Sequence, residues 1–164
     1  MTMSAANSNS DTAHAWELMR KIGVAMLVTR DGEALRARPM WAHLAPDENR
    51  IYFLADARRH KDEEIARASD INLAFADAGK RNYVSVSGQA EVSNDRDRIR
   101  ALFSTAAKAW WTSADDPNIR VLAITPRDAE FWDASGTLVS TIKMAAAAVT
   151  GTRPNLGDNR KVSL

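Results

Sequence analysis

The 164-residue sequence contains no cysteine, which excludes disulfide bonds, thiol nucleophiles and thiolate metal sites. It also has no surplus of either charge: 22 basic and 21 acidic residues give a formal net charge of +1. Such a balance provides no overall field to attract nucleic acid or acidic lipid, so any anion site must come from a local cluster. We therefore expect no nucleic-acid partner.

Long hydrophobic runs are missing as well. No apolar run approaches the roughly 20 residues that a membrane span needs, and residues 1–12 lack the apolar core of a signal peptide. We expect a cytoplasmic protein with no membrane partner. A hydrophobic fraction of 45% suits one domain. We place it at residues 12–151, between a flexible N-terminal tail (1–11) and a polar C-terminal tail or arm (152–164).

Familiar catalytic motifs are absent too. His14, His43 and His60 have no partner at helical spacing, so we predict no metal site. The sequence has no nucleophile elbow, Walker loop or Rossmann glycine pattern. Any chemistry would therefore belong to a bound cofactor, and the catalytic residues stay unassigned.

The residues that are present point first to the segment 35–41, Leu-Arg-Ala-Arg-Pro-Met-Trp. Arg36 and Arg38 are two apart, so in a strand they project from one face and could grip a phosphate together. Pro39 has no backbone N–H and belongs on an edge strand or at a bulge, where ligands can approach. The alternative is a solvated edge strand on which these residues discourage aggregation.

A second basic cluster occupies residues 58–61, Arg-Arg-His-Lys, before a segment of helical composition that runs to Ala68. Basic side chains suit the end of a helix better than its start, so their position here would favour a bound anion. The alternative is a solvated charged turn.

Alternating apolar residues and short turns predict a mainly β protein of the α+β class. The expected strands are 24–30, 34–44, 51–55, 71–76, 83–92, 120–126, 129–133 and 137–142. We expect helices from Asp11 or Thr12 to Ile22, from about residue 94 to Trp110, and over 143–149. Consecutive strands joined by tight turns form a meander that can curl into a barrel.

Trp110 and Trp111 are the unusual feature of the expected helix over 94–110. Adjacent helical residues point about 100° apart. One tryptophan can therefore join the core while the other projects toward a neighbour or ligand, although core and surface packing alone would also explain the pair. We read Asp115-Asp116-Pro117 as a turn and not as a metal site.

Four motifs follow one another in a particular order: Arg38-Pro39-Met40, Phe53 to Asp56 followed by Lys61, Val84 to Glu91, and Ala129 to Asp133. In their order and spacing they resemble the pyridoxamine phosphate oxidase-like, FMN-binding split-barrel superfamily, in particular its bacterial general stress protein branch. The resemblance implies a split β-barrel of about six to seven mostly antiparallel strands with flanking helices.

The same resemblance implies a cofactor site. The family's phosphate contacts fall on Arg38, His60 and Lys61. The residues that match Pro39, Met40, Leu54 and Ala55 lie along the isoalloxazine ring and ribityl chain. Tyr83 occupies a position that often reaches the flavin from the other subunit, and the segment of Trp111 lies near the cofactor and the dimer interface. With Arg36, these residues are our predicted cofactor site.

We therefore expect an FMN-binding homodimer with the flavin at the subunit interface, acting as a flavin-dependent oxidoreductase on a small-molecule electron donor or acceptor and with a stress-related role. Two alternatives are open: a non-catalytic flavin-binding or sensing stress protein, and a deazaflavin-dependent reductase on the same fold. Pyridoxamine phosphate oxidase activity itself is disfavoured, because the expected C-terminal substrate-binding arginine motif is not found.

Overall fold

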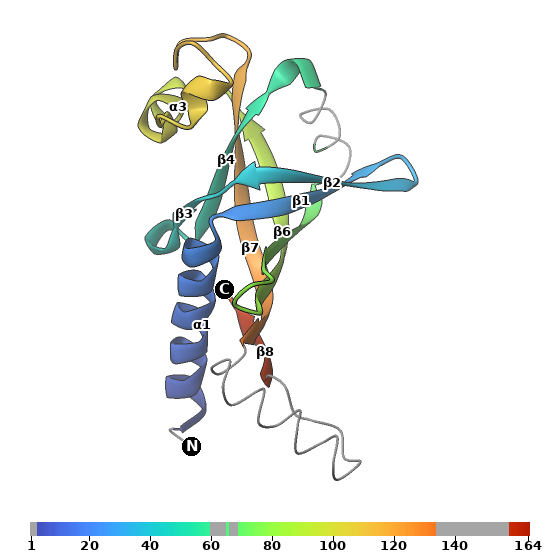
Figure 1. The fold of residues 1–164 in the computed structure, drawn as a ribbon, viewed down its shortest axis with the longest axis vertical. Helices are drawn as coiled ribbons and strands as arrows, with labels where there is room; N and C mark the ends of the chain where they lie inside the picture. The colour runs from blue at the N-terminus through green and yellow to red at the C-terminus, as the bar shows by residue number, and fades with distance from the viewer. Residues whose placement is uncertain (1–2, 60–64, 66–68, 134–157) are drawn as a thin grey trace.

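A computed structural model describes residues 3–59, 65, 69–133 and 158–164 of the chain. The strands are β1 (Val24–Asp31), β2 (Ala34–Trp41), β3 (His43–Ala45), β4 (Arg50–Asp56), β5 (Asp70–Asp77), β6 (Asn82–Ser93), β7 (Ile119–Asp133) and β8 (Asp158–Ser163). The α-helices are α1 (Met3–Ile22) and α3 (Arg96–Leu102), and the 3-10 turns are η1 (Pro46–Glu48), η2 (Ala57–Arg59) and η3 (Ala107–Ala109) (Figure 1). No helix in these ranges is both long and apolar enough to cross a membrane.

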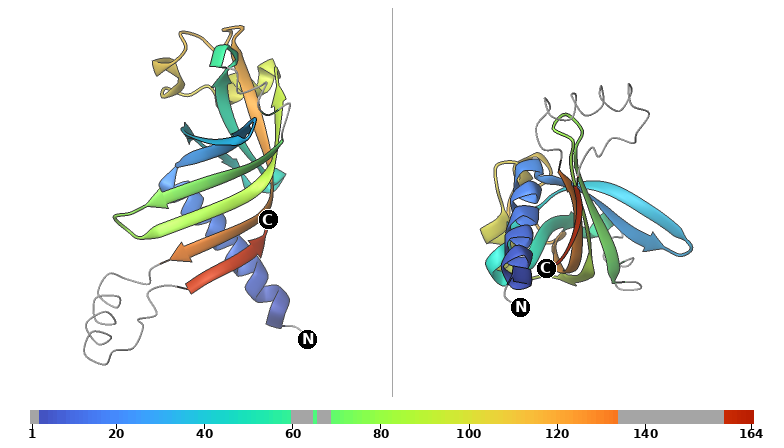
Figure 2. Two further views of the ribbon diagram at one scale, coloured as in Figure 1. Left: turned by 90° about the vertical axis from the view of Figure 1, so that its right-hand side faces the viewer. Right: turned by 90° about the horizontal axis from the view of Figure 1, so that it is seen from below.

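The strands form one antiparallel sheet in the order β2-β1-β5-β6-β7-β4-β3. Its edge strands β2 and β3 are consecutive in the chain and are joined by Ala42 alone, whose N–H donates to the carbonyl of Gly23 at 2.9 Å. The sheet must therefore curl until its two edges lie near each other, and β1 and β2 cross the direction of β4 and β7 (Figures 1 and 2). This confirms the split barrel, with eight strands in the described ranges and not six to seven.

Strand β7 pairs with three other strands of the sheet. It pairs with β6 along nearly its whole length, while β4 covers its other edge at Ile119–Ile124 and β8 covers the same edge at Asp128–Asp133. Two strands separated by a break at Pro126 were expected here, and that prediction is wrong. The β6–β7 register shifts between Ser87 and Gly88, opposite Pro126. Proline has no N–H to donate to the ladder, and a β-bulge at this point accommodates it, so β7 continues past Pro126.

The core fills the inside of the curled sheet. Leu27, Phe53, Leu73 and Phe75 are among its fully buried side chains, and α1 adds Met19. A second, smaller cluster lies on the other face of β4 and β7, where α3 and η3 cover it; its buried members are Tyr52, Ile99, Ala107, Trp111, Ile119 and Val121. The candidate site lies beside this second cluster.

Both ends of the chain differ from expectation. Helix α1 begins at Met3, so most of the segment expected to be a flexible tail is helical, because a helix once nucleated extends readily through residues such as Ala5 and Ala6. Residues 158–163 of the expected polar tail form β8, since β4 leaves that part of the β7 edge unpaired and Val162 becomes buried. The strand expected over 137–142 and the helices expected over 143–149 and up to Ala68 fall outside the described residues.

Candidate functional site

A cavity of about 840 Å³ lies where the end of β2, β3 and β4 meet the segment that follows α3. Its volume is in the upper part of the range for pockets that enclose a small ligand. The lining residues are Val24, Arg38, Pro39, Met40, Trp41, His43, Leu54, Ala55, Asp56, Ser104, Ala106, Ala107, Trp110 and Trp111. Six of the ten predicted cofactor residues therefore line one cavity, namely Arg38, Pro39, Met40, Leu54, Ala55 and Trp111.

Arg38 supplies the cavity with a cation. In the β1–β2 register Arg38 lies opposite Leu27, and both side chains belong to the inner side of the hairpin. Nη1 of Arg38 donates to Oγ1 of Thr29 at 2.8 Å, which fixes the direction of the guanidinium. Pro39 follows on the edge strand, as its missing N–H requires.

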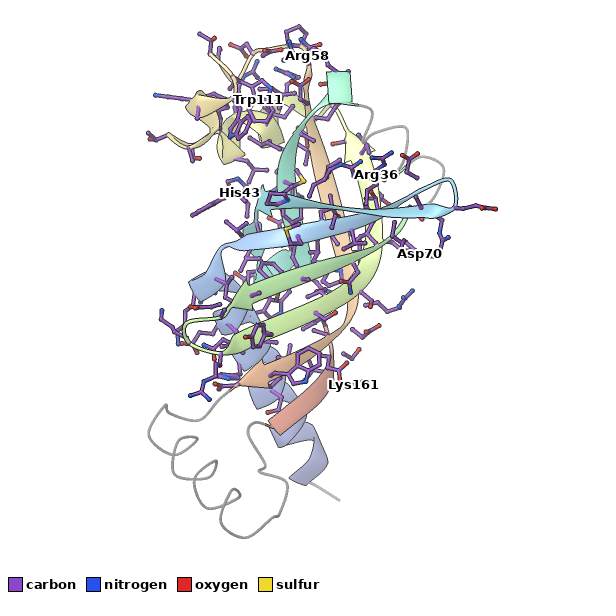
Figure 3. The ribbon with its side chains drawn as sticks, turned by 45° about the vertical axis from the view of Figure 1, so that its right-hand side comes forward. Arg36, His43, Arg58, Asp70, Trp111 and Lys161 are labelled. Atoms are coloured by element: carbon purple, nitrogen blue, oxygen red, sulfur yellow. The ribbon has the colours of Figure 1, made fainter. Side chains whose placement is uncertain are left out.

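Arg36 is on the same side of β2 but does not line the cavity. Its Nε donates to Oδ2 of Asp31 at 2.6 Å, near the hairpin turn. Figure 3 shows Arg36 farther along the hairpin, away from Trp111. The structure thus brings one of the two predicted arginines to the cavity and holds the other against a carboxylate.

The structure describes only part of the second basic cluster at residues 58–61. Arg58 donates hydrogen bonds to the carboxylate of Asp56 from both Nε and Nη2, and the distance from Nη2 to Oδ2 is 2.6 Å. This carboxylate raises the pKa of the Arg58 guanidinium. Asp56 also lines the cavity. His60 and Lys61 lie outside the described residues, so their predicted contact with a phosphate stays a prediction.

Trp110 and Trp111 form one wall of the cavity, although they do not lie on a helix as expected. Helix α3 ends at Leu102, where Phe103 leaves the helical conformation, and the two tryptophans follow the short turn η3. Trp111 packs into the second cluster, whereas 71% of Trp110 is exposed. One tryptophan thus joins a core and the other projects outward, as predicted. Nε1 of Trp111 is buried without a hydrogen-bond partner in the described part of the chain.

Trp41 and His43 line the cavity but were not among the ten predicted cofactor residues. Trp41 ends β2 with 58% of its surface exposed. His43 begins β3, pairs in register with Tyr52 of β4 and is half-buried. Removal of water around the imidazole lowers the pKa of His43 below its ordinary value. Their sequence signal was their closeness to Arg38-Pro39-Met40.

Tyr83 lies elsewhere. It pairs with Trp132 of β7 and with Ala76 of β5, and it is not among the residues that line the cavity. Its predicted contact with a flavin of the other subunit is an intermolecular contact, which a single chain does not test.

An apolar surface adjoins the cavity on the outer side of the β1–β2 hairpin. Val24 faces Trp41 across the register and Met26 faces Pro39, and Leu35 near the turn is 68% exposed. We call these five residues the hairpin face. Val24, Pro39 and Trp41 also line the cavity, so the two are continuous.

In chemical terms the cavity combines a cation with flat apolar walls. Such a set of groups suits a ligand that has a planar ring system and an anionic group. No group of three or more histidine, aspartate or glutamate side chains in the described ranges could hold a metal ion.

Comparison with known proteins gives the family. The family model described as "Pyridoxamine 5'-phosphate oxidase like" matches residues 10–155. General stress protein 26 of Bacillus subtilis is 30% identical over 91 residues, which are 51% of this chain and 62% of that protein, so the match spans less than two thirds of the relative. Protein bli-3 of Neurospora crassa is 22% identical over 151 residues, 84% of this chain and 72% of that protein.

Solved structures agree on the fold. A general stress protein 26 from Jannaschia sp. CCS1 has 23% identity and a TM-score of 0.72, covering 94% of this chain and 99% of that one. The general stress FMN/FAD binding protein from Xanthomonas citri has 21% identity and a TM-score of 0.69, covering 79% and 92%. At these identities the likeness establishes the fold alone. With the family model covering most of its length, the chain belongs to the pyridoxamine 5'-phosphate oxidase-like family, and the resemblance seen in the sequence motifs is confirmed.

Proposed function

We propose that this protein binds FMN in the cavity between Arg38-Pro39-Met40 and the Trp110-Trp111 wall. The observation that carries the proposal is the convergence of six family-type positions on one cavity in a member of this family. The Xanthomonas citri relative is described as an FMN/FAD binding protein, which supports a flavin as the ligand class.

The residues present fit such a ligand. The guanidinium of Arg38, aligned by Thr29, offers charge-assisted hydrogen bonds to a phosphate. Met40, Leu54 and the indoles provide apolar surface for a ring. Bound FMN would supply hydride and electron transfer, and the protein would bind it, orient it and exclude water. The walls offer few proton-transfer groups, so orientation is their main contribution.

The proposal includes a homodimer with the cavity at its interface. The hairpin face (Val24, Met26, Leu35, Pro39 and Trp41) exposes five apolar residues on one side of β1 and β2, and exposed apolar surface of this kind marks interaction sites. Since three of these residues also line the cavity, a second copy seated on this face would cover the ligand. An obligate interface of this kind buries on the order of 2,000 Å² or more.

The activity we propose is that of an FMN-dependent oxidoreductase that accepts electrons from a nicotinamide nucleotide and passes them to a small acceptor. The general stress protein relatives support a role in stress. Two measurements test the proposal. The first is titration with FMN, riboflavin and a deazaflavin cofactor, in which FMN should bind most tightly. Equal affinity for FMN and riboflavin would contradict the phosphate contact.

The second measurement is anaerobic stopped-flow bleaching of the bound flavin by NADH and NADPH, followed by a screen of acceptors. We expect one nucleotide to bleach the flavin and an acceptor to restore its colour. If dithionite bleaches the flavin but neither nucleotide does, and no acceptor is turned over, the proposed oxidoreductase activity is contradicted and flavin binding alone stands.

A further inference from the structure

His43 is a titratable side chain of the cavity that the proposed binding of FMN leaves without a role. His43 lines the same cavity as Arg38 and Trp110. In the described part of the chain no side chain or backbone group hydrogen-bonds to this ring or forms an ion pair with it. A half-buried imidazole has a donor and an acceptor to satisfy, and a ligand in the cavity can hydrogen-bond to them in place of water.

We propose that the neutral imidazole of His43 is a direct hydrogen-bonding contact of the flavin ring in this cavity, so that acid pH weakens flavin binding. This inference rests on the proposed function. It adds a specificity contact and a pH response to that site.

The surroundings of His43 favour the neutral form. On β2 the charged group that lines the cavity is the guanidinium of Arg38, which carries a positive charge. On β4 the cavity has Asp56, whose carboxylate is engaged by Arg58, and the cross-strand neighbour Tyr52, whose hydroxyl donates to Glu48 at 2.5 Å.

On the remaining side, the segment after α3 contributes no ionisable group among the described lining residues: Ser104, Ala106, Ala107, Trp110 and Trp111. Desolvation is the cause of the lowered pKa of His43. A flat ring laid against the imidazole would remove more water from it and lower that pKa further.

The sign of the pH effect follows from linkage. If flavin binding lowers the pKa of His43, the complex holds fewer protons than the free protein, so affinity is greatest above the pKa of the free protein and falls as pH drops through it. Each unit by which binding lowers the pKa weakens binding at acid pH by up to about tenfold.

The experiment uses riboflavin as the probe, because the phosphate of FMN titrates with a second pKa near 6 and would obscure the effect. Riboflavin affinity is measured by fluorescence quenching at constant ionic strength over a pH series, for the wild type, His43→Gln and His14→Gln. His14 lies on α1 beside Asp133, outside the cavity, and is the matched control. We expect at least threefold weaker binding at the acid end for the wild type and His14→Gln, and no pH step for His43→Gln.

A second readout is NMR titration of the histidine ring signals with and without riboflavin. With three histidines in the chain, His43 is assigned from the variants, or by elimination from His14→Gln and His60→Gln if His43→Gln does not fold. Riboflavin should lower the pKa of His43. An unchanged or raised pKa, or an equal pH step in His43→Gln, overturns the contact while flavin binding stands. Failure of FMN and riboflavin to bind at any pH overturns both the proposed function and the His43 contact.

Discussion

Arg38 and Thr29 are joined across the β1–β2 hairpin by a hydrogen bond of 2.8 Å from Nη1 to Oγ1. Thr29 is only 1% exposed and is the one polar residue among the buried side chains of the described ranges. A buried hydroxyl costs free energy unless it is hydrogen-bonded, and this contact offsets part of that cost. The contact couples the interior of the hairpin to the cation of the cavity.

The first prediction follows from that contact. Thr29→Val keeps the shape of the side chain but removes the acceptor, so Arg38 loses a hydrogen bond that helps to align it, and FMN affinity should fall about fivefold, the equivalent of about 1 kcal/mol. Thr29→Ser keeps the hydroxyl and should bind FMN like the wild type. Isothermal titration calorimetry measures both, and an FMN affinity that is unchanged in Thr29→Val would show that the hydroxyl does not contribute to the alignment of Arg38.

The second prediction separates the two arginines. Arg38→Ala removes a charge-assisted contact with the FMN phosphate and should weaken FMN by about ten- to a hundredfold. Riboflavin, which lacks the phosphate, should bind Arg38→Ala nearly as well as the wild type. Arg36→Ala is the matched control on the same strand. Because Asp31 holds Arg36 outside the cavity, it should change FMN affinity little; a loss as large as that of Arg38→Ala would restore the two-arginine clamp.

The third prediction concerns assembly. Met26→Lys places a charge in the hairpin face and should convert the proposed dimer to a monomer, because an unpaired charge in an apolar interface is strongly unfavourable. Ala101→Lys, at an exposed position of α3, should leave the dimer intact. Light scattering at micromolar protein concentration measures the oligomeric state directly. A wild-type monomer with FMN at full occupancy would contradict the interface site.

The fourth prediction is a pH dependence of stability. The hydroxyl of Tyr52 and the guanidinium of Arg98 both hydrogen-bond to the carboxylate of Glu48, and they lower the pKa of Glu48 below its ordinary value of 4.5. Because the folded state holds this proton less tightly than the unfolded state, the contribution is present above pH 4.5 and is lost as pH falls further.

Glu48→Gln should therefore be less stable than the wild type at pH 7, and the gap should narrow below pH 4.5. Urea unfolding at a series of pH values measures the gap. A difference in stability between Glu48→Gln and the wild type that does not change across this pH range would show that the carboxylate charge contributes nothing to stability.

The fifth prediction tests the bulge opposite Pro126. A Cβ at Gly88 would lie 2.5 Å from the carbonyl oxygen of Thr125, a backbone atom that cannot move aside easily. Gly88→Ala should reduce the free energy of unfolding by about 1–3 kcal/mol. Gly79→Ala is the control, because its nearest atom is 3.4 Å away, and it should change stability by less than about 0.5 kcal/mol. Chemical denaturation compares the two, and equal stabilities would refute the tight contact.

Much of the fold was predictable because its signals are local. The turn at Asp31-Gly32, the alternation along β6 and the apolar face of α1 each lie within a short window of sequence. The Arg38-Pro39-Met40 side of the site was predictable for the same reason. The pairing of β8 was not, since Val162 is its one apolar residue and its partner edge exists only once β7 has formed.

The missed site residues depend on three-dimensional placement. Trp41 and His43 reach the cavity because the chain passes from one sheet edge to the other between them, which no periodicity reveals. The helix expected up to Trp110 ended early because Phe103 takes an extended conformation after Leu102. Local patterns and the family resemblance therefore found the strand that carries the cation and also Trp111, while Trp41 and His43 required the tertiary structure.

The one-residue junction at Ala42 has a consequence for the tolerance of this chain to insertion. Because Ala42 alone joins β2 to β3, an added residue there would shift one strand by a full position and turn its side chains to the opposite face. Trp41 and His43 flank the junction, so such a shift would misplace a wall of the cavity even if the barrel still formed. The hairpin turn at Gly32 has open space around it and is the better place to lengthen this part of the chain.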